Sequence, residues 1–241
     1  FMIPKLLKKM GVECVKLFCN PNGQFPHNPE PLPENLTEIS KLVVEEKAHF
    51  GIVVDPDVDR LAMVCEDGSM FGEEYTLVAV ADFVLSKTPG NTVSNLSSTR
   101  ALRDVTNIHN GQYQASAVGE VNVVEKMKAC NAIIGGEGNG GIIYPELHYG
   151  RDALIGVALF LTQLAERKIS AKTLRDSFPN YFISKNKMEL TPEIDVDAIL
   201  STLEKKYKDE QITTIDGLKI DFEDGWVHLR KSNTEPIIRI Y

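Results

Sequence analysis

The sequence has few cysteines, no long apolar run and no excess of positive charge, and each absence excludes a class of protein. Its four cysteines, Cys14, Cys19, Cys65 and Cys130, form no C-x-x-C pair and no zinc-like cluster, so we expect reduced thiols in a cytoplasmic protein. The longest apolar stretch, within ALIGVALFLTQLA, has about 13 residues, which is too short to span a bilayer. The net charge of −8 at pH 7 argues against nucleic acid or an anionic membrane as a partner.

The remaining composition is that of an ordinary folded chain. Of 241 residues, 43% are hydrophobic and 25% are charged, which suffices for a substantial core and for two or more domains. The sequence begins at Phe1 within FMIPKLLKKMG, which has the pattern of an amphipathic helix, and it stops within the apolar run IIRIY. We therefore expect it to be a fragment of a longer protein.

The first part of the chain alternates between strand-like and helix-like segments. Residues 12–18 alternate in polarity like a strand, and residues 35–48 have the spacing of an amphipathic helix. The five prolines of CNPNGQFPHNPEPLPENL, between these segments, predict a surface loop. Strands are predicted over 51–54 and 61–66, on either side of an acidic cluster. This alternation indicates an α/β layer.

Two further units follow along the chain. Residues 71–183 show the same alternation around a glycine-rich stretch, whereas residues 184–241 combine an amphipathic helix with a meander of strands. The predicted fold class is α/β, with two successive mixed-sheet α/β domains, the first of them incomplete, followed by a small α+β C-terminal domain. The predicted domains are 1–70, 71–183 and 184–241.

The acidic cluster lies in GIVVDPDVDRLAMV, where Asp55, Asp57 and Asp59 occupy every second position. At about 4 Å and an effective dielectric near 20, each like-charged pair costs roughly 4 kcal/mol, so such a cluster takes up protons, spreads into water or binds a cation. A solvated acidic turn is one interpretation. An EF-hand loop is rejected, because its sixth position is Arg60 instead of glycine and the flanking runs are β-like.

A third interpretation of the cluster fits better. A turn stiffened by Pro56 aims alternate carboxylates at one hard divalent cation, and Mg²⁺ keeps open positions for water or phosphate oxygens. Arg60 is adjacent, where it is suited to balance charge or to contact a phosphate group.

A glycine-rich stretch, GGEGNGG at residues 135–141, formally matches the dinucleotide-binding pattern G-x-G-x-x-G. The apolar IIYPE that follows predicts a strand, however, and a dinucleotide site needs a helix there. The glycines would let the loop approach a ligand closely, with Glu137 and Asn139 as its hydrogen-bonding side chains. A flexible turn is the alternative.

Two other stretches carry polar groups suited to capping or binding. In YGRDAL, Asp152 is a candidate helix N-cap, and Arg151 has a structural interpretation. In RKSNTEP, residues 230–236, a guanidinium, two hydroxyls, an amide and turn backbone N–H groups suit a phosphate dianion. A polar hairpin turn is the alternative for this second stretch.

Taken in this order and at these spacings, DPDVDR, GEGNGG, GRDA and RKSNTEP resemble the α-D-phosphohexomutase family, which includes phosphoglucomutases, phosphomannomutases and phosphoglucosamine mutases. FPHNPEPLPENL and VGEVNVVEKM are also similar to that family, so the resemblance covers nearly the whole chain. It implies four domains around a deep cleft, each contributing one loop.

The resemblance also implies roles for individual residues. The first family loop carries a phosphoserine, the second binds Mg²⁺, the third reads sugar hydroxyls and the fourth grips the substrate phosphate. Arg60 and Glu120 are the catalytic candidates, and Glu120 occupies a position where some relatives carry a cleft histidine. The implied binding residues are Asp55, Asp57 and Asp59 for the metal, Glu137 and Asn139 for the sugar, and Arg230, Ser232, Asn233 and Thr234 for the phosphate.

The sequence departs from the family pattern at several points. It contains no T-x-S-H-N-like serine loop, and Pro56 stands where the family usually has glycine. Many relatives have serine and histidine at the positions of Asn139 and Gly141, so a histidine sometimes credited with proton transfer is absent.

The resemblance implies a Mg²⁺-dependent phosphohexomutase as the parent protein. It would interconvert 6-phosphates and 1-phosphates of glucosamine, mannose or glucose through a phosphoserine and a sugar 1,6-bisphosphate. The expected partners are thus the phosphorylated hexose and its bisphosphate, and the expected location is the cytoplasm. The chain alone, without the nucleophilic serine, is expected to be inactive. A non-catalytic module that binds sugar phosphates is the alternative.

Overall fold

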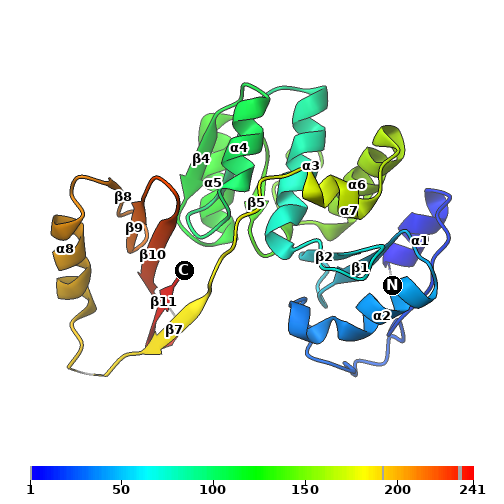
Figure 1. Cartoon of the computed structure of the whole chain (residues 1–241), viewed down its shortest axis with the longest axis horizontal. Coiled ribbons are helices and arrows are strands. Elements are labelled where there is room, and N and C mark those ends of the chain that lie inside the picture. The colour runs from blue at the N-terminus through cyan, green and yellow to red at the C-terminus, as the bar shows by residue number, and fades with distance from the viewer. Residues whose placement is uncertain (1, 192, 233–234) are drawn as a thin grey trace.

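The computed structural model describes residues 2–191, 193–232 and 235–241, which form three sections in chain order (Figure 1). In the first section, the two antiparallel strands are flanked by helices, and strand pairing runs from Phe50 opposite Cys65 to Val54 opposite Leu61. Its elements are α1 (Met2–Lys9), a 3₁₀ turn (Pro33–Asn35), α2 (Thr37–Glu45), β1 (Phe50–Val54) and β2 (Leu61–Cys65).

The strand predicted over residues 12–18 is wrong, because the structure has irregular backbone there. Alternating polarity produces a strand only where the backbone of a neighbouring strand is within hydrogen-bonding distance. In the described part of the first section, β1 and β2 pair with each other and not with this segment.

The middle section is a mixed four-stranded sheet covered by helices. Its strand order is β4-β3-β5-β6, in which β3 runs parallel to both β4 and β5, and β6 runs antiparallel to β5. The elements are α3 (Glu73–Lys87), β3 (Asn91–Asn95), α4 (Ala101–Ile108), β4 (Tyr113–Ser116), α5 (Glu120–Cys130), β5 (Ala132–Glu137), β6 (Gly141–Ile143), α6 (Ala153–Arg167) and α7 (Ala171–Asp176).

The C-terminal section is an antiparallel five-stranded sheet with one helix. The strand order is β7-β11-β10-β9-β8. Its elements are β7 (Asn186–Glu189), α8 (Val196–Lys206), β8 (Gln211–Thr213), β9 (Leu218–Asp221), β10 (Trp226–Lys231) and β11 (Ile237–Ile240). The predicted α/β class with a small α+β C-terminal domain is confirmed.

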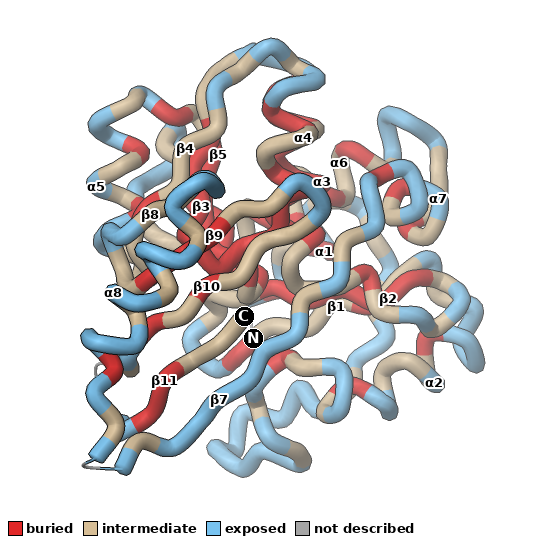
Figure 2. The backbone as a smooth tube through the Cα atoms, turned by 60° about the vertical axis from the view of Figure 1, so that its left-hand side comes forward, coloured by how far each residue is buried: buried red, intermediate tan, exposed pale blue. Residues whose placement is uncertain are grey.

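The main core joins the first and middle sections. Helix α3 is apolar around its circumference and is buried along most of its length, as expected of a helix enclosed by other elements. Phe71 and Phe160 are fully buried and meet edge to face, with ring centroids 5.1 Å apart. Figure 2 shows the buried backbone concentrated in the middle section and in β2. Because this core is continuous, the loops at its edge are held by packed elements.

The C-terminal section docks on the middle section through the segment that follows β3. His228 is fully buried and lies 2.9 Å from Ser97 Oγ through its Nδ1 atom. Lys219 Nζ donates to the Leu96 carbonyl at 2.9 Å, and Arg100 pairs with Asp221 at 3.0 Å. Among the described residues, no helix combines the length and apolar character needed to cross a bilayer.

Candidate metal and phosphosugar site

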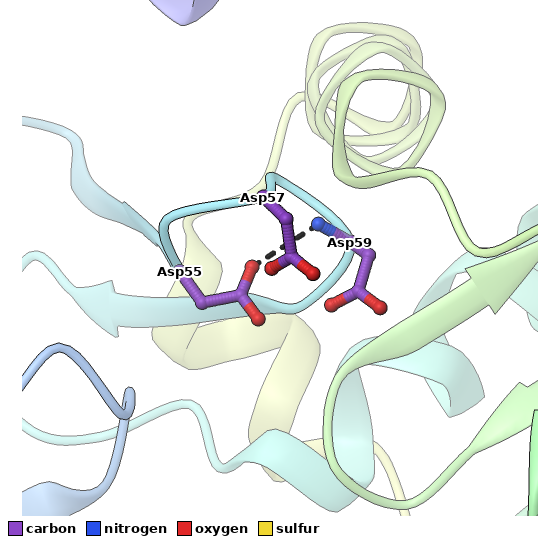
Figure 3. Close-up of side chains that lie close together, drawn as sticks. All are labelled: Asp55, Asp57 and Asp59. Carbon is purple, nitrogen blue, oxygen red and sulfur yellow. Dashed lines mark hydrogen bonds between the residues drawn. The ribbon is translucent and has the colours of Figure 1, made fainter.

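The acidic loop, residues 55–60, connects β1 to β2 in a tight turn. Val58 N–H donates to the Asp55 carbonyl at 3.1 Å, and Val58 has a positive φ of 64°, which is costly for a β-branched residue. The Val58 carbonyl accepts a hydrogen bond from the N–H of Ala153, the first residue of α6. Tertiary contact thus holds the turn in a strained conformation that places the aspartates on one side of it (Figure 3).

The three carboxylates converge as the spacing predicts. Ligand atoms of Asp55, Asp57 and Asp59 all lie within 4.8 Å of one another, and the three residues are respectively buried, exposed and half-buried. Burial opposes ionisation of Asp55, but the N–H groups of Arg60 and Asp59, which donate to Asp55 Oδ1 at 3.0 and 3.1 Å, hold its pKa below the usual value. Burial and the neighbouring Asp55 carboxylate raise the pKa of Asp59 to about 6.

This donor set fits a hard divalent cation. Asp59 Oδ1 is a buried oxygen that accepts no hydrogen bond from any described residue. Three carboxylates offer only oxygen ligands, which are the ligands that Mg²⁺ and Ca²⁺ prefer. Arg60 lies beside the cluster, with Nε 3.5 Å from Asp55 Oδ2, and its Nη1 contacts Glu30 of the proline-rich loop at 3.3 Å.

The glycine-rich loop, residues 135–141, is joined directly to the acidic loop. Arg60 and Gly141 form an antiparallel bridge, and the N–H of Leu61 donates to the Gly140 carbonyl at 3.0 Å. A Cβ atom on Gly140 would lie 2.3 Å from the Leu61 carbonyl oxygen, and one on Gly138 would lie 2.0 Å from Glu74 Oε2. These glycines therefore permit close approach between parts of the protein, in addition to any approach of a ligand.

Glu137 is buried, and protein donors occupy both of its carboxylate oxygens. Oε1 accepts from Asn95 Nδ2 at 2.8 Å and from the N–H of Gly119 at 3.2 Å, while Oε2 accepts from Arg151 Nη1 at 2.9 Å. Asn139 is half-buried, and its Oδ1 accepts from the Gly141 N–H at 3.2 Å. A sugar hydroxyl would therefore reach the Glu137 carboxylate by sharing or displacing one of these contacts.

Glu120 begins α5 and also faces Arg151. Its Oε1 accepts from the Arg151 N–H at 2.8 Å, and its Oε2 lies 3.5 Å from Arg151 Nε. The Glu120 side chain keeps 36% of its surface exposed, so it remains accessible to a ligand. Asp152 accepts N–H bonds from Leu154 and Ile155 at the start of α6, which confirms the predicted N-cap.

The C-terminal loop, residues 230–236, begins with the last two residues of β10, Arg230 and Lys231. Arg230 Nε donates to Asp216 Oδ2 at 3.0 Å, and the same oxygen accepts from the N–H of Val118 at 2.9 Å. The Ser232 N–H donates to the Ile237 carbonyl at 2.9 Å, which connects β10 to β11. The predicted phosphate ligands Asn233 and Thr234 lie outside the described residues.

A continuous set of polar contacts links the three loops. Arg151 joins Asp59 of the acidic loop to Glu137 of the glycine-rich loop. Glu137 accepts the Gly119 N–H, and the adjacent Val118 N–H leads through Asp216 to Arg230. Residues that are far apart in the sequence are thus brought into one network.

Sequence reasoning missed three members of this network or its surroundings. Arg151 was interpreted only as a structural residue. Its position next to the predicted N-cap Asp152 was the one signal that could have drawn attention to it. Asp216 and Asn95 were not among the predicted site residues. None of the three has a local pattern that indicates its partner, because each partner lies in another element.

Glu74, at the start of α3, accepts a hydrogen bond from the Thr99 N–H at 2.9 Å, and its burial should make stability depend on pH. Burial raises its pKa from 4.5 to about 7, against the opposing charge of Lys185. The folded chain then retains a proton that the unfolded chain releases, so the free energy of unfolding should fall as the pH rises through this interval. Glu74→Gln should remove that dependence, which is at most about 3 kcal/mol.

Urea unfolding of both proteins at the two ends of this pH interval measures the effect. Glu73→Gln is the matched control, because Glu73 also pairs with Lys185, at 2.6 Å. Equal pH dependence in the wild-type chain and in Glu74→Gln would contradict the assignment.

Comparison with known proteins agrees with the fold described above. Models of the phosphoglucomutase/phosphomannomutase family match in chain order: alpha/beta/alpha domain II at residues 1–68, alpha/beta/alpha domain III at 72–181 and the C-terminal domain at 187–241. The chain belongs to this family, as the resemblance predicted.

Individual relatives are similar over the same region. The phosphoglucomutase/phosphomannomutase of Thermococcus kodakarensis is 35% identical over 99% of this chain and 53% of its own length. The phosphomannomutase/phosphoglucomutase of Pseudomonas putida is 33% identical, over 98% and 52% respectively. A crystal structure of a family protein from Burkholderia thailandensis has a TM-score of 0.85 at 28% identity, and the match covers 98% of this chain and 52% of that one. The chain therefore spans about half the length of these relatives.

Proposed function

We propose that the chain forms the metal-, sugar- and phosphate-binding part of a cytoplasmic, Mg²⁺-dependent phosphohexomutase. The whole enzyme would interconvert the 6-phosphate and 1-phosphate of glucosamine, mannose or glucose through a phosphoserine and a sugar 1,6-bisphosphate. The observation that carries this proposal is the network that joins Asp59, Glu137 and Arg230 through Arg151 and Asp216. The proposed domains are 1–70, 71–183 and 184–241.

Each section contributes one part of the proposed chemistry. Asp55, Asp57 and Asp59 would hold Mg²⁺, which supplies a Lewis acid at the transferring phosphoryl group when it is bound. Arg60 balances the charge of the acidic loop, in keeping with its 3.5 Å approach to Asp55. Glu120 is the candidate for moving a proton to or from the sugar hydroxyl, because it is a partly exposed carboxylate beside the network.

The other proposed ligands orient the substrate. Glu137 and Asn139 read the sugar hydroxyls, and a clamp that includes Arg230 and Ser232 holds the phosphate group that is not being transferred. The proposal extends this clamp to Asn233 and Thr234. A clamp that accepts either end of the sugar serves both half-reactions, since the two phosphates exchange roles when the bisphosphate reorients.

The test of this proposal is calorimetric titration of the 241-residue chain with Mg²⁺ and with the three hexose 6-phosphates, alongside a turnover assay. Binding of both ligand types without turnover is expected, because phosphoryl transfer needs the nucleophile that the resemblance places in another domain. Turnover by the pure chain would contradict the expectation that this chain alone is inactive. A full-length protein that binds sugar phosphates without turnover would favour a binding module instead.

Asp57→Asn tests the metal assignment. The substitution removes an anionic oxygen while keeping the size of the side chain, so Mg²⁺ affinity should fall about tenfold or more, which is roughly 1.4 kcal/mol. Asp67→Asn is the control, because Asp67 is an exposed aspartate of the same section that lies outside the cluster. Equal Mg²⁺ affinity in wild type and Asp57→Asn, measured by calorimetry, would contradict the metal site.

Arg230→Ala tests the phosphate clamp. Loss of a charged hydrogen-bond donor should weaken binding of a hexose phosphate by about 1.5–3 kcal/mol. Arg167→Ala is the control, because Arg167 lies at the end of α6, where it pairs with Asp82 at 2.7 Å, outside the proposed clamp. If the two variants bind the sugar phosphate equally well, the Arg230 clamp is refuted.

A further inference from the structure

The backbone of Arg151 is held in place by contacts with β6 and α5. Arg151 forms an isolated antiparallel bridge with Ile143, and its N–H donates to Glu120 Oε1 at 2.8 Å. The next residue, Asp152, caps α6, and its N–H donates to the Ile142 carbonyl at 2.9 Å. The end of β6 and the start of α6 therefore set the point from which the Arg151 side chain extends.

The guanidinium of Arg151 contacts carboxylates from three separate segments. Nη1 lies 2.9 Å from Glu137 Oε2, Nε lies 3.5 Å from Glu120 Oε2, and Nη2 pairs with Asp59 Oδ2. Only 16% of the Arg151 side chain is exposed, so water screens these contacts weakly. A rigid planar fork fixes the directions of several carboxylates at once, which the point charge of a lysine does not.

The glycine-rich loop leaves room for this side chain. A Cβ atom on Gly141 would lie 2.4 Å from Arg151 Cδ, a distance that real side chains do not adopt. The aliphatic part of the Arg151 side chain therefore packs against the Cα atom of Gly141 and extends from there to Asp59. The packing against Gly141 and the contacts with three carboxylates are independent observations, and both indicate a role for Arg151.

We infer that Arg151 is a positioning residue that couples the acidic loop to the sugar-reading carboxylates. This inference rests on the proposed function, because it takes Asp59 as a cation ligand and Glu137 as a sugar ligand. Asp59 is shared between the cation site and Arg151, so a cation on Asp59 weakens the hold of Arg151 on that residue. The donors of Arg151 then become available to Glu120, Glu137 and the sugar. Binding of the cation and binding of the sugar phosphate are consequently linked, and the linkage is reciprocal.

The experiment measures that linkage with defined probes. The dissociation constant of glucosamine 6-phosphate is determined by calorimetry without Mg²⁺ and with saturating Mg²⁺, using the full chain. Mg²⁺ should tighten sugar-phosphate binding by about fivefold or more in the wild type, the lower end of typical coupling between sites. In Arg151→Gln the ratio of the two constants should fall to about one. Arg151→Lys should restore it only in part, because the charge returns without the fork.

Two further variants separate positioning from general effects. Arg167→Gln removes an arginine from the other end of α6, where it pairs with Asp82 at 2.7 Å, and should keep the wild-type ratio. Gly141→Ala keeps the Arg151 charge but displaces its stem, and should also lower the ratio. Circular dichroism and thermal unfolding identify any variant that fails to fold.

The possible outcomes are distinguishable. A wild-type ratio in Arg151→Gln, or a ratio of one in the wild type while both probes bind, would overturn the coupling role and leave the proposed function standing. If the wild-type chain binds neither Mg²⁺ nor glucosamine 6-phosphate, the proposed function itself fails, and the coupling role fails with it.

Discussion

Replacing Arg100 with alanine should release the C-terminal section from the middle section. Arg100 is 9% exposed and pairs through Nη2 with Asp221 at 3.0 Å, and its guanidinium also donates to carbonyls of the turn between β9 and β10. The donor-to-carbonyl distances are 2.7 Å for Phe222 and 3.2 Å for Glu223. Removing one partner of a buried ion pair leaves the other charge uncompensated, so we expect a loss of about 3–5 kcal/mol.

Limited proteolysis measures this release directly. The segment 182–186, which connects the two sections, is largely exposed, and it should be cleaved faster when the docked state is less populated. Arg103→Ala is the matched control, because Arg103 lies in the first turn of α4, which Arg100 immediately precedes, and has 39% of its side chain exposed. Cleavage of Arg100→Ala at the wild-type rate would show that Lys219 and His228 suffice to hold the section in place.

Replacing Gly140 with alanine should break the junction between the acidic loop and the glycine-rich loop. Gly140 has a φ of +87°, and a Cβ atom there would lie 2.3 Å from the Leu61 carbonyl oxygen. That carbonyl also accepts a hydrogen bond from the buried Thr76 hydroxyl at 3.1 Å, so it has little freedom to move. Overpacking and a left-handed backbone together should cost about 3 kcal/mol or more.

Urea unfolding and Mg²⁺ titration together measure the effect of Gly140→Ala. The free energy of unfolding should fall, and the Mg²⁺ affinity should fall with it, because Leu61 directly follows the acidic loop. Gly225→Ala is the control, since a Cβ atom on Gly225 meets nothing within 4 Å and its backbone is not left-handed. Similar stability of the two variants would mean that the glycine-rich loop adjusts without cost.

The fold class and the acidic triad could be predicted because both depend on local patterns. Strands β1 and β2 follow from short β-branched and apolar runs, and the every-second-residue spacing of Asp55, Asp57 and Asp59 already places three carboxylates in one turn. The prediction over residues 12–18 failed for the opposite reason, because a strand needs a partner that no local pattern contains.

Two short elements of the middle section could not be predicted from their own sequence for the same reason. Strand β4 (Tyr113–Ser116) and helix α7 (Ala171–Asp176) are short, so their own periodicity carries little information. Pairing of β4 with β3 and packing of α7 against the core make them regular. Tertiary contacts therefore supply what the local sequence leaves undecided.

The sequence by itself determined the order of the sections, the residue types of the three loops and the family to which they belong. Only the tertiary structure decided that Arg151 joins Asp59 to Glu137, that Asp216 holds Arg230, and that glycines 140 and 141 serve contacts within the protein. The physical reason is distance along the chain. Spacing within a turn is a local property of the backbone, whereas an ion pair between separate elements exists only after the core between them has packed.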